Sequence, residues 1–297
     1  MSVGAIVTAP PYAEFLGEVA THPLVRGLRL NTVMPVRGGP AEALRRLSGL
    51  GQPVWVDLKG RQLRVVGGAI PPFTELRLSH PIQVRTPVVA YFGDGREVAR
   101  VMEVDGDRLI LEDGPRRYVG PGESVNIPDA SLRVLGTLTE TDRAYLEAMR
   151  ATGLPHVMLS FVESLADVEE LRALLPSAEI VLKIESSRGM DFARRHGAAH
   201  GRLMAARGDL YLEIGRPHRI AAAVREILAK DPQAIAASRI LESLARGPEP
   251  ECADVGDAAF LLGCGYHTLL LGDAVCLRRE SVLAALNLLE ELARNLG

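Results

Sequence analysis

Lysine is scarce in this sequence. Only three of the 34 lysine and arginine residues are lysines, namely Lys59, Lys183 and Lys230. Arginine occupies all the other basic positions. A lysine retained near the end of the apolar segment IVLKIE (180–185) therefore indicates a position that needs a compact ammonium group, because the planar guanidinium of arginine is a poor substitute for a point charge.

Other scarce features exclude several classes of protein. The three cysteines form no CxxC pair and the seven histidines form no HxH or HExxH motif, which predicts reduced thiols and no zinc or redox centre. No apolar run is long enough to span a bilayer, and the N-terminal segment lacks the basic start of a signal peptide. The net charge of −3, with both signs scattered, gives no basic stripe. We expect a cytoplasmic protein without membrane or nucleic-acid partners.

Eight short and nearly continuous apolar runs recur along the chain. Such runs are typical of parallel strands that are covered on both faces. Helical patterns separate most of them, for example at 138–153 and 164–176. Eight strand–helix units in 297 residues predict an α/β fold, a TIM (β/α)8 barrel. The expected strands are 3–9, 27–31, 53–58, 156–161, 179–185, 202–207, 234–238 and 267–272.

One segment interrupts this alternation. Strand-like runs between residues 69 and 127 are separated by Asp-Gly pairs, which are a strong hairpin signal. We predict a small antiparallel β domain over 69–127, inserted after the third barrel strand, and a barrel formed by 1–68 and 128–297. The insert should cover the C-terminal mouth of the barrel. The Asp-Gly pairs lie at 94–95, 105–106 and 113–114.

Polar residues stand at or just after the C-terminal ends of five expected strands. Side chains two residues apart share one face of a strand, and the C-terminal ends of barrel strands converge on the active site of this fold. These groups should therefore meet in one cavity. A buried ion network without chemical function is the alternative, although a network of this size has no stability rationale. The residues are Arg29 with Asn31, Asp57 with Lys59, Lys183 with Glu185, Asp209, and Ser238.

Two of these side chains form a candidate metal site. Glu185 and Asp209 belong to neighbouring strand segments, and two carboxylates open to a cleft are the minimal protein contribution to a Mg²⁺ or Mn²⁺ site. Lys183 would stabilise negative charge that develops on a metal-bound substrate. The motif ARGDL (206–210) indicates a turn into a short helix whose free N–H groups could hold an anion.

The order of motifs along the whole chain resembles the pyruvate kinase family. The combination of KIE, ARGDL and LESL is specific. The resemblance implies a barrel with a β domain inserted after the third strand, and chemistry on phosphoenolpyruvate or pyruvate. The motifs are LRLN, VDLKGRQLR, GESVNIP, LTETD, SFVES, VLKIESSRGMDF, MAARGDLYLEIG, ASRILESL and LLLGDA.

The resemblance implies roles for the residues at the substrate. Glu185 and Asp209 would hold a divalent metal that chelates pyruvate or phosphoenolpyruvate. Lys183 would stabilise the transferring phosphoryl group and the enolate. Further matches would contact the substrate, and these are the backbone of Ala206, Arg207 and Gly208, the hydroxyl of Ser238, which stands where the family has a threonine, and Arg29 at the phosphate.

The resemblance also implies a potassium site and a nucleotide side. Asn31 and Asp57 match two potassium ligands, and Leu58 could contribute its carbonyl oxygen. Arg64 matches an arginine on the nucleotide side, and Lys59 belongs to the same motif. Through Arg64 and Lys59 the resemblance implies a site that could take ADP or ATP next to the substrate, and the sequence leaves open whether a nucleotide is bound.

Departures from the family pattern fall on the potassium and nucleotide sides. A potassium-ligating serine is Val33 here, and lysines that reach the nucleotide phosphates correspond to Gly122 and Glu123. A glutamate beside a triphosphate is repulsive. The insert is smaller than is usual in the family, and only one further helical pattern follows the last barrel strand. The resemblance therefore implies a shortened member without the family's C-terminal domain.

The enolate half of the pattern is intact. We interpret the sequence as a pyruvate-kinase-like, divalent-metal-dependent enzyme that acts on phosphoenolpyruvate or pyruvate through a metal-bound enolate, with phosphoryl transfer to a nucleotide as one version. The alternatives are a lyase or aldolase that acts on a 2-keto acid at the same site, and a catalytically inactive relative that binds a metabolite. The sequence leaves the oligomeric state open, a homo-oligomer included.

Overall fold

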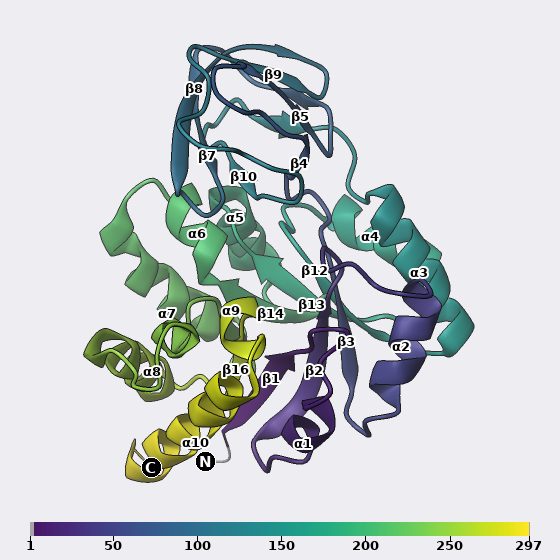
Figure 1. Cartoon of the computed structure of the whole chain (residues 1–297), viewed down its shortest axis with the longest axis vertical. Coiled ribbons are helices and arrows are strands. Elements are labelled where there is room, and N and C mark those ends of the chain that lie inside the picture. Colours follow the sequence, from purple (N-terminus) through teal and green to yellow (C-terminus); the bar gives the residue numbers. More distant parts are fainter. Residues whose placement is uncertain (1–2, 297) are drawn as a thin grey trace.

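Eight parallel strands close into a barrel in the structure, a computed structural model that describes residues 3–296 (Figure 1). The strands are β1 (Gly4–Thr8), β2 (Val25–Asn31), β3 (Val54–Leu58), β12 (His156–Leu159), β13 (Glu179–Ile184), β14 (Arg202–Ala206), β15 (Ile235–Ala237) and β16 (Thr268–Leu271). Their order around the barrel is β1-β16-β15-β14-β13-β12-β3-β2. Each strand falls within one of the expected apolar runs or extends it by two residues at most, so the predicted TIM barrel is confirmed.

Helices lie outside the barrel strands (Figure 1). Helix α3 begins as its sequence predicts, because the Thr139 hydroxyl accepts the Asp142 N–H at 3.0 Å and the Asp142 carboxylate accepts the Thr139 N–H at 3.0 Å. It ends at Gly153, whose φ of 73° is left-handed. The helices are α1 (Leu16–Ala20), α2 (Pro40–Ser48), α3 (Glu140–Thr152), α4 (Leu165–Leu174), α5 (Ser187–His196), α6 (Arg207–Glu213), α7 (Ile220–Lys230), α8 (Cys252–Cys264), α9 (Asp273–Cys276) and α10 (Arg279–Leu296), with 3-10 turns η1 (Pro217–Arg219) and η2 (Glu242–Ala245).

The barrel interior is filled by apolar side chains from alternate strand positions. These side chains form a buried cluster that is separate from the larger core between strands and helices. Because successive side chains of a strand alternate between its two faces, the residue two positions after an interior side chain faces inward as well. This rule directs Lys183, two residues after Val181, to the inside of the barrel mouth. The interior cluster consists of Ile6, Met158, Val181, Met204, Ala206, Ile235, Ala237 and Leu270.

The insert is an antiparallel β domain with a hydrophobic cluster of its own. Its six-stranded sheet has the order β10-β7-β8-β9-β5-β4, and β11 pairs with β6 in a second, two-stranded sheet. Both sheets use residues outside the expected range of 69–127. The strands are β4 (Val65–Gly67), β5 (Glu75–Leu78), β6 (Ile82–Gln83), β7 (Val88–Phe92), β8 (Glu97–Asp105), β9 (Arg108–Leu111), β10 (Val125–Asn126) and β11 (Arg133–Val134).

Two of the three Asp-Gly pairs form the predicted hairpins. The pair 94–95 connects β7 to β8, and the pair 105–106 connects β8 to β9. The pair 113–114 does not form a hairpin, because β9 pairs with β5 and β8, and the chain after this turn leads to Val119, which bridges to Ala69.

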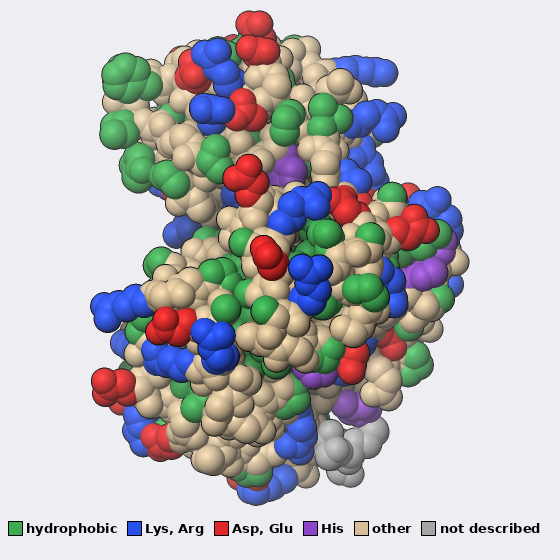
Figure 2. Space-filling model, turned by 90° about the vertical axis from the view of Figure 1, so that its right-hand side faces the viewer, with side chains coloured by type: hydrophobic (Ala, Val, Ile, Leu, Met, Phe, Trp, Pro, Cys, Tyr) green, Lys and Arg blue, Asp and Glu red, His purple; other side chains and the backbone are tan. Residues whose placement is uncertain are grey.

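Two paired segments connect the insert to the barrel. Leu63 and Val65 lie on the entering segment, and backbone hydrogen bonds join it to the leaving segment, from Val65 N–H to Glu123 O at 3.0 Å and from Val125 N–H to Leu63 O at 3.0 Å. Figure 2 shows the insert above the barrel, with a waist between them and with both signs of charge interspersed over this face. In the described part of the chain, no helix is long and apolar enough to cross a membrane.

Candidate active site

A cavity of about 550 Å³ lies where the barrel strands end. Residues at the ends of β2, β3, β13, β14, β15 and β16 line it, and so do Asp94 and Arg96 on the β7–β8 turn of the insert. The insert therefore reaches over the barrel mouth. Seven of the residues predicted from sequence line this cavity, namely Arg29, Asp57, Lys183, Ala206, Gly208, Asp209 and Ser238.

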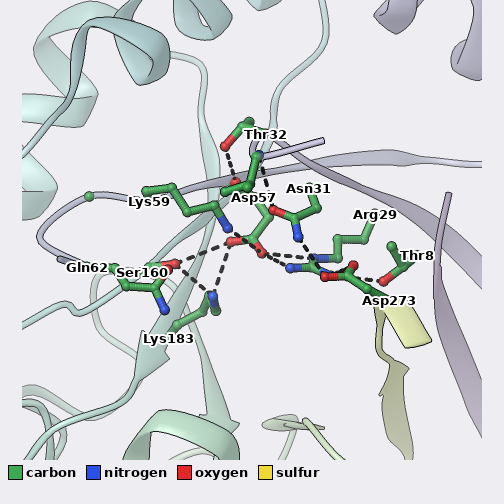
Figure 3. Close-up of polar contacts among 12 residues, drawn as sticks. Thr8, Arg29, Asn31, Thr32, Asp57, Lys59, Gln62, Ser160, Lys183 and Asp273 are labelled. Atoms are coloured by element: carbon green, nitrogen blue, oxygen red, sulfur yellow. Dashed lines mark hydrogen bonds and ion pairs between the residues drawn. The ribbon is translucent and has the colours of Figure 1, made fainter. Parts of the chain in front are cut away.

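Asp57 is the centre of the charged cluster (Figure 3). Its carboxylate is fully buried and accepts hydrogen bonds from Arg29 Nε at 2.8 Å and Lys183 Nζ at 3.2 Å. Arg29 Nη2 donates to this carboxylate as well, as do Lys59 Nζ at 3.4 Å and the Ser160 hydroxyl at 3.3 Å. Burial alone would raise the pKa of Asp57, but the three cationic side chains hold it well below its usual range. The Asp57 carboxylate thus forms ion pairs with basic side chains from the ends of three strands.

Lys183 lies between two carboxylates. Its Nζ is 3.2 Å from Asp57 Oδ1 and 3.2 Å from Glu185 Oε1, and it donates to the Ser160 hydroxyl at 2.7 Å. Burial lowers the pKa of the ammonium group, but Asp57 and Glu185 outweigh this and raise the pKa above its ordinary value. Lys183 therefore keeps its positive charge at neutral pH. A compact ammonium can contact all three oxygens at once, which accounts for a lysine in this arginine-rich chain.

The two expected metal ligands differ in their surroundings. Glu185 is only 2% exposed and is not among the residues that line the cavity, and its Oε2 accepts the Phe161 N–H at 2.8 Å. Burial and the neighbouring Asp209 raise the pKa of Glu185 to about 7, against the opposing effect of Lys183. Asp209 lines the cavity, and its oxygens accept amide N–H groups from Gln62 at 2.9 Å and Asn126 at 3.1 Å.

The chemistry of this donor set suits a hard divalent cation. Carboxylate oxygens are the ligands of Mg²⁺ and Mn²⁺, which keep waters and substrate oxygens at their other positions. Asp209 is held by neutral amides, and among the described residues it forms no ion pair with a lysine, arginine or histidine. Within residues 3–296, no group of three or more His, Cys, Asp and Glu side chains is arranged to hold a metal. A site with only Glu185 and Asp209 as protein ligands would leave the other coordination positions to waters and substrate.

The residues after β15 are held in a strained conformation. Ser238, Arg239 and Leu241 have φ values of 74°, 58° and 53°, in the left-handed region that non-glycine residues rarely adopt. Gly208 packs beside this segment, and a Cβ at this position would make an ordinary contact of 3.4 Å with Ser238 Oγ. Strain of this kind is typical of ligand-binding segments.

The ARGDL motif turns from β14 into α6 as predicted. Ala206 caps the helix, and Arg207 and Gly208 are its first residues. The Arg207 side chain does not face the cavity but binds Asp257 with two hydrogen bonds of 2.6 and 2.8 Å. Arg207 therefore anchors this turn, and only its backbone remains for the carboxylate binding that the resemblance implies.

The expected potassium ligands already contact other groups of the protein. Asn31 donates its amide N–H to Asp273 and accepts the Val33 N–H with its oxygen at 3.3 Å. The Leu58 carbonyl accepts a backbone N–H at 3.2 Å. Asp57 already contacts three cationic side chains, which would repel a further cation. These oxygens are satisfied by the protein itself.

The nucleotide side differs from the expectation as well. Arg64 donates to Gln62 Oε1 at 2.6 and 3.1 Å and to the Gly122 carbonyl at 2.8 Å. Neither Arg64 nor Lys59 lines the cavity. Glu123 is bound by Arg117 at 2.6 and 2.9 Å, so its negative charge is compensated and the expected repulsion of a triphosphate is smaller than the sequence alone suggests.

Four further polar residues of the site escaped the sequence analysis. Asp273, two residues after the end of β16, binds Arg29 at 2.7 Å and Asn31 at 2.8 Å. Ser160, directly after β12, links Lys183 to Asp57. Both follow a strand end, so the rule that selected the other candidates could have found them. Gln62 and Asn126 lie at the root of the insert, and no strand pattern indicates that they meet Asp209.

The fold and the cavity define a class of capped TIM-barrel proteins, in which a charged site lies between the strand ends and an inserted β domain. Comparison with known families identifies the member of this class. The profile of the family described as pyruvate kinase, barrel domain, matches residues 79–275. The chain belongs to the pyruvate kinase family.

Several curated relatives are named pyruvate kinase. The chain is 34% identical to that of Agrobacterium vitis over 65% of its own length and 33% identical to that of Encephalitozoon cuniculi over 65%. It is 25% identical to that of Methanocaldococcus jannaschii over 80%. The matched part spans 39%, 44% and 57% of these relatives, respectively.

Proposed function

We propose that this protein is a divalent-metal-dependent enzyme that acts on phosphoenolpyruvate or pyruvate through an enolate. The proposal rests on the position of Lys183. It lies at the mouth of the barrel, in contact with Asp57 and Glu185, and faces the cavity that Asp209 also lines. A charged ammonium that contacts the candidate metal ligand Glu185, at a cavity that Asp209 lines and the insert partly covers, is suited to stabilise a developing oxyanion.

Glu185 and Asp209 would hold Mg²⁺ or Mn²⁺. When bound, the ion supplies positive charge that orients and polarises the carboxylate and carbonyl oxygens of the substrate. Lys183 stabilises the enolate oxygen, and the Ser160 hydroxyl and Asp57 hold its ammonium in place. Ser238 lines the same cavity and offers a hydroxyl group to the substrate.

Phosphoryl transfer to ADP is the version that the rim of the cavity favours. Arg96 on the insert and Arg239 on the barrel both line the cavity, and arginine binds phosphate well. Arg29 is a third guanidinium group there, although Asp57 and Asp273 bind it. A lyase on a 2-keto acid would use the same Lys183 site without these arginines. Proton NMR with phosphoenolpyruvate, with and without ADP, separates the two versions.

Metal binding is the first testable consequence. We expect Mn²⁺ to bind weakly to the free protein and more tightly with oxalate, which mimics the enolate of pyruvate. Calorimetric titration measures both affinities. Glu185→Gln and Asp209→Asn should each weaken binding, because each removes one of the two anionic ligands. Unchanged affinity in both variants would exclude this metal site.

Potassium dependence is a second consequence. We expect the reaction to proceed at nearly the same rate in K⁺ and in tetramethylammonium, because Val33 offers no ligand and Asp57 already contacts three cations. The rate should be measured at constant ionic strength with either cation. A many-fold higher rate in K⁺ would show that the ion binds in spite of these contacts.

A further inference from the structure

The orientation of Asp209 depends on residues outside its own helix. Each of its carboxylate oxygens accepts one side-chain amide N–H, Oδ2 from Gln62 at 2.9 Å and Oδ1 from Asn126 at 3.1 Å. Both amides are buried, with 3% of Gln62 and 1% of Asn126 exposed. Two donors on two oxygens fix both the position and the rotation of a carboxylate.

The two amides come from the two segments that carry the insert. Gln62 precedes Leu63 on the entering segment, and Asn126 follows Val125 in β10 on the leaving segment. The Val125 N–H bonds to the Leu63 carbonyl at 3.0 Å, so the two amides flank a backbone hydrogen bond at the root of the insert. The two side chains that orient the Asp209 carboxylate therefore belong to the base of the insert and not to the barrel strands.

Further contacts fix which end of each amide faces Asp209. Arg64 donates two hydrogen bonds to Gln62 Oε1, so the NH₂ group of Gln62 points to the carboxylate. The Asn126 NH₂ group also donates to Glu213 Oε1 at 3.1 Å, and a flipped amide would turn its oxygen toward two carboxyl groups. Asn126 Oδ1 accepts no hydrogen bond within residues 3–296, so the placement of this amide rests on the two contacts of its NH₂ group.

We propose that Gln62 and Asn126 are positioning residues that set the metal affinity of Asp209, and that the insert thereby couples its own position to the metal site. The inference rests on the proposed metal site at Glu185 and Asp209. Neutral amides suit this task, because they orient a carboxylate without neutralising it, whereas a cationic partner would compete with the metal. Residues that hydrogen-bond to metal ligands typically change metal affinity about 10–100-fold when they are replaced.

The test is Mn²⁺ binding, followed by electron paramagnetic resonance of free and bound Mn²⁺ in the presence of oxalate. Gln62→Met and Asn126→Leu keep most of the side-chain volume and remove the amide. We expect each to weaken Mn²⁺ binding about 10–100-fold and to alter the line shape of bound Mn²⁺. Arg64→Met keeps both amides, frees Gln62 to rotate, and should weaken binding in the same direction. Folding is checked by circular dichroism without metal.

Arg188→Met is the matched control. Arg188 donates to the carbonyls of Ala130 and Leu132, lies 3.6 Å from Glu163, and so ties α5 to the segment that leaves the insert, without a hydrogen bond to Asp209, Gln62 or Asn126. Mn²⁺ affinity should stay as in the parent. If Arg188→Met and Gln62→Met lose Mn²⁺ affinity equally, any loosening of the insert weakens the metal site. This result would overturn the specific role of the amides.

The outcomes separate this inference from the proposed function. A parent that binds Mn²⁺ with oxalate, together with folded amide variants that bind it equally well, overturns the positioning role and leaves the metal site intact. A parent that binds no more Mn²⁺ than its Asp209→Asn variant overturns the metal site and the positioning role with it. If Mn²⁺ affinity falls in the amide variants and stays unchanged in Arg188→Met, the result supports both the metal site and the positioning role.

Discussion

Replacement of Lys183 by methionine should slow the exchange of pyruvate methyl protons with D₂O about 10²–10³-fold, the usual effect of losing one electrostatic donor in a shielded site. The exchange requires an enolate but no nucleotide, so it isolates the step assigned to the ammonium group. Methionine keeps the length and apolar stem of the lysine. Oxalate and Mn²⁺ should still bind, because Glu185 and Asp209 are retained, and proton NMR of the methyl signal follows the exchange.

Two controls decide between a chemical and an architectural role for this lysine. Lys183→Arg keeps the charge but should fail as well, because a planar guanidinium cannot occupy a point-charge position between Asp57 and Glu185. Lys230→Met removes an exposed lysine at the end of α7 and should have no effect. Normal exchange in a folded Lys183→Met variant would assign the residue to a structural ion network.

A further result would favour the inactive, metabolite-binding relative. In that case the parent binds oxalate and Mn²⁺, yet neither exchanges pyruvate protons nor converts phosphoenolpyruvate with ADP. Proton exchange without turnover of phosphoenolpyruvate and ADP would instead favour a lyase. One set of NMR spectra therefore distinguishes the three hypotheses, which are a kinase, a lyase and an inactive relative.

The barrel could be predicted from sequence because the patterns that indicate its strands lie within short segments of the chain. Each strand is a continuous apolar run, and the rule that alternate residues share a face places Lys183 two positions beyond Val181 at the barrel mouth. The same rule predicted that Asp57 and Arg29 lie in one cavity, although 28 residues separate them. The family resemblance agreed with these local patterns and added the roles of the residues.

The contacts that decide how the site works could not be predicted in this way. Gln62 and Asp209 are 147 residues apart, and Arg29 and Asp273 are 244 apart. The root of the insert has no regular period that would direct Gln62 or Asn126 toward α6. Similarly, only the structure shows that Asp57 is occupied by protein cations and that Arg117 neutralises Glu123.

Replacement of Asp57 by asparagine should lower the free energy of unfolding by about 3–5 kcal/mol at pH 7, as is usual when one partner of a buried ion pair is removed. Asparagine preserves the shape of the side chain and its contact with Ser160. It leaves Arg29, Lys59 and Lys183 buried together without the carboxylate that compensates them. Unfolding in urea, followed by circular dichroism, measures the difference between parent and variant.

The pH dependence of this difference identifies its cause. The pKa of Asp57 is well below its usual range in the folded protein, so its contribution to stability is present above the unfolded pKa of about 3.9 and is lost as the pH falls toward the folded pKa. The difference in stability between parent and Asp57→Asn should therefore begin to shrink below about pH 4 and should vanish only as the pH reaches the lower pKa of Asp57 in the folded protein. Asp273→Asn is the matched control, because Asp273 binds the same Arg29 but its side chain is 41% exposed, and its loss should cost at most about 1 kcal/mol. Equal costs for the two substitutions, or a difference that persists unchanged at acid pH, would show that Asp57 does not act as the shared counter-ion of the three cationic side chains.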